Sequence, residues 1–121
     1  MPEINKAEVY RKAAEIIVRD GQAKSTLVNG PVREITNPRY SVCALGACAR
    51  AEYELYGTLP LEDGDLDPYG PYTFYVSWDN QGYVRNWSIH SINDMRETSA
   101  EDIALLLKRR AEEVEGDSTE A

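Results

Sequence analysis

The chain has 121 residues, of which 42% are hydrophobic, and a formal net charge of −8 at pH 7. This length and apolar content suit one domain with a core of its own and argue against global disorder. The acidic balance disfavours direct binding to nucleic acid, and no apolar run approaches the ~20 residues that a membrane-spanning helix needs.

The predicted compartment is a reducing cytoplasm. The N-terminal sequence lacks the basic and then apolar plan of a secretory signal peptide. Cys43 and Cys48 lie five residues apart on a predicted helix, which separates their Cα atoms by about 8–9 Å. Because a disulfide needs Cα atoms within about 7 Å of each other, both cysteines are predicted to be reduced thiols.

Acidic residues concentrate in two segments. Residues 112–121 carry five acids, and without them the net charge is about −3. We therefore predict one domain over residues 1–115 and an acidic, disordered tail over residues 116–121. Residues 62–67 carry four more acids. Their spacing lacks the glycine and the bidentate glutamate of a calcium-binding loop, so we expect an exposed acidic loop without a metal.

The first predicted element is an amphipathic helix over residues 4–19. Apolar residues recur there at helical spacing, namely Tyr10, Ala13, Ala14 and Ile17. Gly21 is placed to end this helix as a left-handed cap. A short hairpin is then predicted over residues 26–35 with its turn at Asn29-Gly30, although Pro31 cannot donate a hydrogen bond to a strand pair.

A second helix is predicted to begin at Asn37-Pro38, with Ser41 as a competing cap, and to end at Gly57. Its apolar stripe consists of Val42, Leu45, Ala49, Tyr53 and Tyr56, and small residues keep the rest of its surface thin. Gly46 costs about 1 kcal/mol in helix propensity relative to alanine. We therefore expect the backbone of another segment to approach the helix closely at Gly46.

The clearest predicted hairpin pairs residues 72–78 with residues 83–89 across a turn at residues 79–82. A capping box from Thr98 to Glu101 then starts the last helix, whose apolar stripe runs from Ile103 to Val114. The order is helix, hairpin, helix, loop, hairpin, helix, which segregates strands from helices. The predicted fold class is therefore α+β, with three main helices and one or two antiparallel hairpins.

One interpretation of the polar residues is a thiol-dependent hydrolase. Cys43 would be the nucleophile and His90 the base, with Asn93 or Asp94 orienting the imidazole, as in papain-like enzymes. The structural interpretation is favoured, because cysteines in an alanine-rich helix are usually core residues and Asn-Asp pairs close turns. No catalytic residue is therefore assigned, and no cofactor or metal is predicted.

Aromatic residues are the best indication of a binding surface. Seven of the eleven aromatic residues fall between Tyr69 and Trp87. Part of this set must cover the core, and the remainder is available for contact. The candidate binding residues are Tyr69, Tyr72, Tyr75 and Trp87, because tyrosine and tryptophan dominate the energetics of protein interfaces.

Several short motifs occur in a characteristic order: Ala13-Ala14-Glu15-Ile16-Ile17, Cys43-Ala44-Leu45-Gly46-Ala47, Asn93-Asp94 and the helix from Thr98 to Ala111. In order and spacing they resemble a family of small uncharacterised domains from actinobacteria and their phages. The chain departs from the family pattern at Ile92 and Gln22, where the family often has tryptophan, and His90 lies outside the pattern. The resemblance implies a source and a domain size, but no activity or cofactor.

We therefore expect a cytoplasmic, phage-encoded accessory protein that binds a host or phage protein and contacts neither nucleic acid nor membrane. The aromatic hairpin, the acidic loop, or both would supply the contact surface. The thiol-dependent hydrolase is one alternative, and an acidic decoy for a DNA-binding protein is another. Helices rich in small residues pack within one chain or between copies, so a homo-oligomer remains open.

Overall fold

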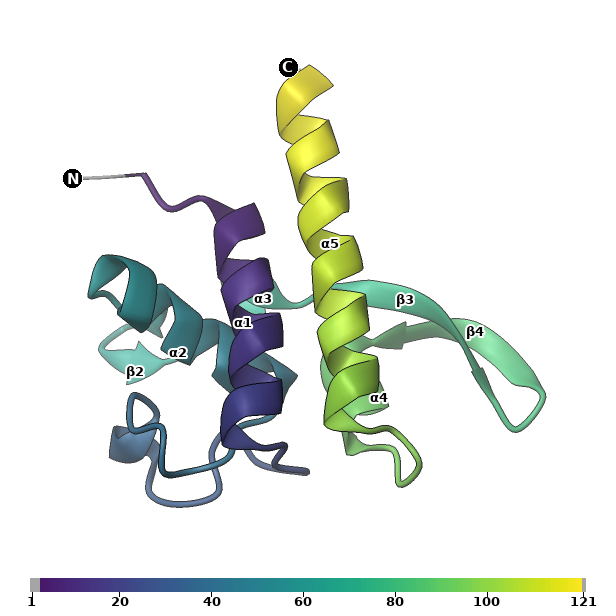
Figure 1. Ribbon diagram of the computed structural model, residues 1–121, viewed down its shortest axis with the longest axis horizontal. Coiled ribbons are helices and arrows are strands. Elements are labelled where there is room, and N and C mark those ends of the chain that lie inside the picture. The colour runs from purple at the N-terminus through teal and green to yellow at the C-terminus, as the bar shows by residue number, and fades with distance from the viewer. Residues whose placement is uncertain (1–2, 121) are drawn as a thin grey trace.

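The computed structural model describes residues 3–120 of the chain and the side chains of residues 3–116. Three long helices dominate it, namely α1 (Lys6–Asp20), α2 (Ala44–Tyr56) and α5 (Ala100–Glu120). Helices α1 and α5 run antiparallel side by side, and α2 packs on the other side of α1 (Figure 1). Two antiparallel two-stranded sheets accompany the helices, so the predicted α+β class is confirmed.

The core forms where the inward faces of the three long helices meet. Tyr10 of α1 lies at its centre, and its ring makes edge-to-face contacts with Tyr72 and Phe74 at centroid distances of 5.9 and 5.4 Å. The apolar stripe predicted for the last helix is buried as well, from Ile103 to Ala111. Residues before and after the aromatic hairpin therefore reach the core, and this anchors both ends of the hairpin.

Helix α1 begins and ends close to where the sequence predicts. Asn5 caps its first turn, because the Asn5 Oδ1 atom accepts a hydrogen bond from the Glu8 amide. The Gly21 amide donates to the Ile17 carbonyl and closes the last turn. Gly21 has a φ of 100° and a ψ of 159°. Only glycine adopts this conformation readily, but it is not the left-handed helical cap that we predicted.

The hairpin predicted around Asn29-Gly30 does not form. Residues 22–43 instead form a wrapped segment whose one regular element is the 3₁₀ helix η1 (Val32–Glu34). Val28 makes an isolated antiparallel bridge to Val42, and the Asn29 amide donates to the Ser41 carbonyl. Pro31 explains the outcome, because it removes a ladder donor, and the backbone groups of Leu27 and Asn29 before it pair with Cys43 and Ser41.

Helix α2 begins later than predicted. Asn37 forms a local turn in which its Oδ1 atom accepts the Arg39 amide, and the cap of α2 is Cys43 rather than Asn37 or Ser41. Gly57 ends the helix in the left-handed conformation, as predicted. The close approach at Gly46 is confirmed, since an added Cβ atom would lie 2.0 Å from the Leu27 carbonyl oxygen.

Helix α2 is buried on all sides over most of its length, and not only along one apolar stripe. Every residue from Ala44 to Glu52 is buried, including Arg50 and Glu52, whereas Tyr53 of the predicted stripe is 44% exposed. The helix is therefore enclosed by α1, by the wrapped segment 22–43 and by the short helices α3 (Tyr69–Tyr72) and α4 (Ile89–Asp94).

The acidic segment forms a very short hairpin between β1 (Leu61–Glu62) and β2 (Asp65–Leu66), where we predicted only a loop. Its turn residues Asp63 and Gly64 have positive φ angles of 52° and 85°, the backbone typical of an Asp-Gly hairpin turn.

Helix α5 is capped one residue later than predicted. Ser99 and Asp102 each accept the other's amide, so Ser99 rather than Thr98 forms the capping box.

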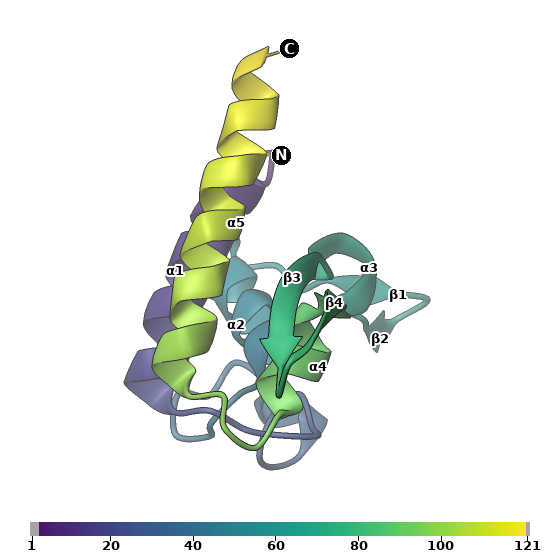
Figure 2. The same ribbon diagram turned by 90° about the vertical axis from the view of Figure 1, so that its right-hand side faces the viewer.

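The aromatic hairpin pairs β3 (Tyr75–Asn80) with β4 (Tyr83–Ser88). The two strands project from the helical body beside α5, as both ribbon views show (Figures 1 and 2). Its turn is Gln81-Gly82, with φ angles of 55° and 84°, so the turn is two residues shorter than predicted. The register places Val76 opposite Trp87 and Trp78 opposite Arg85, so these four residues share one face of the hairpin.

The remaining predictions concern the cysteines, membrane-spanning helices and the C-terminal tail. Both cysteines are free, as predicted. Within the described residues no helix is long and apolar enough to cross a membrane. The disordered tail stays a prediction, because the side chains of residues 117–121 lie outside the described part and α5 is traced to Glu120.

Candidate functional site

The Asn-Asp pair has a structural role at the centre of the fold. Asn93 is fully buried at the end of α4. Its Oδ1 atom accepts the Ala44 amide at 3.2 Å, and its Nδ2 atom donates to the Ala23 carbonyl at 2.9 Å. Gln22 Nε2 also donates to Asn93 Oδ1 at 3.3 Å. Asn93 therefore caps α2 and fixes the wrapped segment with one side chain.

Asp94 continues this connection toward the surface. Its Oδ1 atom accepts the Ser25 amide at 2.8 Å, and Ser25 has a positive φ of 63° that a non-glycine residue adopts at a cost. The same oxygen accepts a hydrogen bond from Asn93 Nδ2. The Asn-Asp pair is thus occupied by backbone groups of Ala23, Ser25 and Ala44, and neither side chain orients an imidazole.

Cys43 lies at the α2 N-terminus, but it is buried and 4% exposed. Its Sγ atom accepts the Gly46 amide at 3.4 Å, which is the helix-capping contact. Burial raises the pKa of the Cys43 thiol, although the Gly46 amide opposes this. A nucleophilic cysteine needs an accessible thiolate and a lowered pKa. Cys43 is buried and the pKa of its thiol is raised, so its environment suits a structural cap and not a nucleophile.

His90 lies in α4, close in sequence to the Asn-Asp pair. Its ring packs edge-to-face on Tyr69 at a centroid distance of 5.2 Å, and its Nε2 atom lies 3.4 Å from Ser88 Oγ. Among the described residues, its buried Nδ1 atom has no hydrogen-bond partner, and no hydrogen bond joins it to Cys43. The structure gathers these residues around the start of α2 without assembling a nucleophile, base and orienting group.

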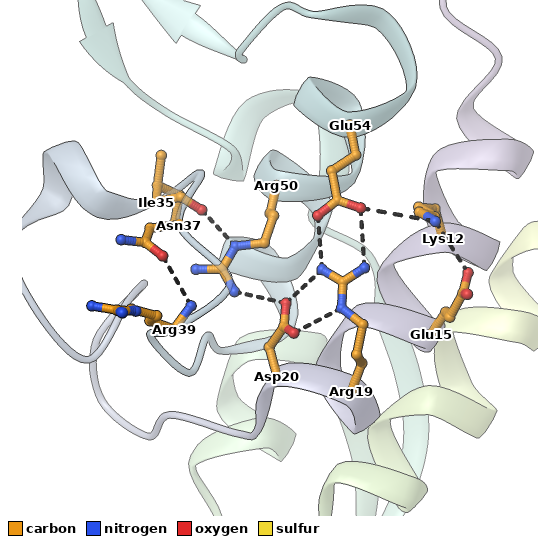
Figure 3. A network of polar contacts seen from close by, with 9 residues as sticks. All are labelled: Lys12, Glu15, Arg19, Asp20, Ile35, Asn37, Arg39, Arg50 and Glu54. Carbon is orange, nitrogen blue, oxygen red and sulfur yellow. Dashed lines mark hydrogen bonds and ion pairs between the residues drawn. The ribbon is translucent and has the colours of Figure 1, made fainter.

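A network of charged side chains joins α1 to α2 (Figure 3). Arg50 is fully buried, and it donates to the Ile35 carbonyl at 2.7 Å and to Asp20 at 3.0 Å. Asp20 also pairs with Arg19, which reaches Glu54 at 2.7 Å. Burial alone would raise the pKa of the Asp20 carboxyl, but the hydrogen bonds from Arg19 and Arg50 hold that pKa below its ordinary value.

A second buried network explains why Tyr72 is unavailable for binding. Tyr72 is 1% exposed, and its hydroxyl donates to Glu52 at 2.6 Å. Thr58 donates to the other oxygen of Glu52, and the Tyr10 hydroxyl donates to the Tyr72 carbonyl. Burial is the main cause that raises the pKa of Tyr72. Tyr72 was expected in an exposed patch, and its place in the core is a correction.

The remaining candidate binding residues differ in exposure. Tyr75 at the start of β3 is 69% exposed, and Tyr69 is 45% exposed beside His90. Trp87 is half-buried, because it packs toward the core on the inner face of the hairpin. The guanidinium carbon of Arg85 lies 3.8 Å from the Trp87 ring centroid and covers the exposed side of that ring.

Two exposed residues at the hairpin tip were not among the predicted binding residues. Tyr83 and Val84 are 65% and 62% exposed, and they lie on opposite faces of β4. Arg85 also stacks at 5.8 Å from the Tyr83 ring. The signal was available, because residues next to the turn of a hairpin lie farthest from the elements that anchor it. The candidate contact surface is therefore the β3–β4 arm, defined here as residues 75–88.

Two hollows border β3. The first has a volume of about 260 Å³ and lies between the start of β3 and α5, where Leu106, Arg109 and Arg110 line it. The second has a volume of about 380 Å³ and lies between the end of β3 and residues 95–98, including Met95 and Glu97. Neither contains a metal-ligand cluster, and the described residues hold no group of three or more such ligands anywhere.

Fold and site together define a small, single-domain α+β protein with a projecting hairpin arm. The sequence profile of a family of unknown function, DUF6197, matches residues 1–113, and the chain belongs to that family. Comparison with curated proteins gives no match, and comparison with solved structures gives none.

Proposed function

We propose that this chain is a small accessory protein that binds another protein through the β3–β4 arm. The observation that carries the proposal is the exposure of apolar side chains on both faces of a two-stranded hairpin. Tyr75 and Val84 are exposed on the outward face, and Tyr83 on the inner face. Water contact with these groups is unfavourable, and a two-stranded hairpin is marginal by itself. A partner that covers the arm removes both costs.

The proposal extends to the source and the compartment. The motif order in the sequence resembles domains of actinobacteria and their phages, so the proposed partner is a host or phage protein in the host cytoplasm. Tyrosine and arginine are the residue types that most often anchor protein interfaces. The Arg85 guanidinium lies over the rings of both Tyr83 and Trp87, and these side chains supply such an anchor at the inner side of the arm.

The test is affinity capture from a nuclease-treated actinobacterial lysate with three versions of the chain. These are wild type, a Tyr75→Ala and Tyr83→Ala double variant, and a Tyr53→Ala control on α2, where Tyr53 is 44% exposed. We expect one protein to be retained by wild type and by the control, and lost by the double variant. Circular dichroism must first show that all three are folded.

Other outcomes count against the proposal. Equal retention by the double variant places the contact elsewhere, and capture of nothing specific removes the binding function. Deletion of residues 112–121, which carry five acids, distinguishes the acidic-decoy alternative, since a decoy that depends on the tail loses its target and an arm-dependent binder keeps it. Purified partner and chain then give the dissociation constant directly.

A further inference from the structure

The outer edge of β3 presents backbone groups that the hairpin does not use. A two-residue turn makes Asn80 and Tyr83 a hydrogen-bonded pair, and such pairs alternate along the ladder. The Ile89 amide donates to the Phe74 carbonyl at 2.9 Å, which agrees with this alternation. The amide and carbonyl groups of Tyr75, Ser77 and Asp79 therefore point away from β4, on the side where β3 faces α5 (Figure 2).

Nothing in the strand itself blocks pairing at this edge. Proteins commonly protect exposed edges with proline, lysine or a β-bulge. The sequence of β3 contains no proline and no lysine, and its register with β4 runs without interruption from Tyr75 to Asn80. The two hollows lie along the strand, one beside residues 74–77 and the other beside residues 78–81.

The charges that line these hollows differ in sign. Arg109 and Arg110 line the hollow at the start of β3, together with Glu113, which pairs with Arg110 at 3.2 Å. Asp79 and Glu97 line the hollow at the end of β3. The hollow at the start of β3 is therefore basic and the hollow at its end is acidic, and the two together are called the β3 groove below. An occupant that complements both ends must carry the opposite order of charges along its own length.

We propose that the occupant is a second copy of this chain, paired through β3 as an antiparallel four-stranded sheet. A two-fold axis at Ser77 places Tyr75 of one copy opposite Asp79 of the other, and all four of these residues offer outward backbone groups. The same axis brings the acidic end of one groove to the basic end of the other. This is the self-complementary surface that an isologous dimer requires.

This inference does not depend on the proposed function. It uses the backbone edge of β3 and the groove charges, whereas partner binding is assigned to exposed side chains of the arm. Self-association of the pure chain is measured without lysate, so the failure of one proposal is distinguishable from the failure of the other.

The first experiment is sedimentation velocity on the full chain over a range of concentrations. We expect a concentration-dependent species of twice the 13.6 kDa chain mass. Ser77→Pro is the test variant and Asn86→Pro its matched control, because the two residues face each other and both direct their amides outward, Ser77 from β3 and Asn86 from β4. Ser77→Pro should weaken dimerisation about tenfold or more, and Asn86→Pro should not.

The second experiment exchanges charges and does not rely on a proline variant folding. Glu97→Arg alone and Arg109→Glu alone each create like-charge contacts across the axis and should weaken self-association. Mixed in equal amounts, the two variants should form a mixed dimer, because both contacts are then attractive. Native mass spectrometry separates the mixed species from either homodimer after one variant is isotopically labelled.

Three results overturn the inference. The first is a wild-type chain that stays monomeric up to about 1 mM. The second is a dimer that Asn86→Pro disrupts and Ser77→Pro leaves intact, which assigns the interface to β4. The third is the absence of a mixed dimer in the charge exchange. A mixed dimer that is at least as stable as wild type supports the proposed axis.

Discussion

The helical body and the β3–β4 arm differ in how far their side chains are buried. In the body, buried polar groups such as Asn93, Glu52 and Asp20 have hydrogen-bond partners from elements distant in sequence. In the arm, Tyr75 and Tyr83 remain mostly exposed. The body therefore carries the stability, and the arm carries surface that the fold does not need. Groups that are not needed for folding are the ones available for binding.

The two regions meet at the base of the arm. The Ile89 amide donates to the Phe74 carbonyl there, and Val76 and Trp87 pack against the core. A substitution in the body should therefore act on the free energy of unfolding, and one near the hairpin tip should leave that free energy almost unchanged. Substitutions in the two regions test this division.

Gly46→Ala should produce a large loss of stability. The added Cβ atom would lie 2.0 Å from the Leu27 carbonyl oxygen, so the wrapped segment must move away from α2. The cost should exceed about 3 kcal/mol and outweigh the ~1 kcal/mol that alanine gains in helix propensity. Urea denaturation measures the difference. The control is Gly116→Ala, where nothing lies within 4 Å and a neutral or stabilising effect is expected.

Arg50→Met should destabilise the protein by about 3 kcal/mol, because it leaves the buried Ile35 carbonyl unpaired and removes one of the cations beside Asp20. Thermal and urea unfolding should agree on the loss. Arg19→Met is the matched comparison, since Arg19 is a more exposed member of the same network. An equal loss in both variants would contradict the importance of burial.

Asn93→Ala should cost about 2–3 kcal/mol, since it leaves the Ala44 amide and the Ala23 carbonyl without their partner. Asn93→Asp separates the two contributions. A carboxylate still accepts from the Ala44 amide but cannot donate to the Ala23 carbonyl. Hydrogen exchange should show faster opening at the start of α2 and at residues 22–25, and unchanged exchange there would contradict the assigned role.

Acid should weaken the body through Asp20 and Glu54. The hydrogen bond from Arg19 is the main cause that lowers the pKa of Glu54, and the hydrogen bonds from Arg19 and Arg50 lower the pKa of Asp20 against the effect of burial. A carboxyl group whose pKa is lower in the folded state than in the unfolded state stabilises the fold while it is ionised. This stabilisation is fully present above the pKa of the unfolded state, near 4, and is lost as the pH falls through the pKa of the folded state. The free energy of unfolding should therefore fall between about pH 5 and pH 2, less steeply in Arg50→Met.

Tyr83→Ala should change the free energy of unfolding by less than about 0.5 kcal/mol, because the side chain is 65% exposed. Ile89→Ala, at a fully buried position just after β4, should instead cost about 2–5 kcal/mol. Urea denaturation of both variants checks the contrast. A large loss from Tyr83→Ala would show that the arm tip contributes to the fold and would remove the division between the two regions.

Much of the local structure was predictable. Helical spacing of apolar residues located α1 and α5, and the alternation around Gln81-Gly82 located β3 and β4. The small residues of α2 predicted the close approach at Gly46. The prediction of a hairpin over residues 26–35 was wrong. Val28 pairs with Val42 instead, and these two residues are too far apart in the sequence for a local turn signal such as Asn29-Gly30 to indicate their pairing.

The candidate site was less predictable than the fold. Tyrosines at 72 and 75 look alike in sequence, yet Tyr72 donates to buried Glu52 and Tyr75 stays exposed. Tyr83 was missed because its exposure depends on how far the hairpin projects from the body. Neither strand contains a sequence motif that indicates how far the hairpin projects from the body.

Local sequence patterns were enough to locate α1, α5 and the aromatic hairpin and to predict that neither cysteine is in a disulfide. Those features depend on periodicity, turn chemistry and spacing, which act within a few residues. The tertiary structure alone decided which polar groups are buried and which aromatic residues are exposed. Asn93 meets Ala44 and Ala23 across separations of 49 and 70 residues. Contacts over such distances depend on the packing of the whole chain, and packing decides which surfaces remain open to a partner.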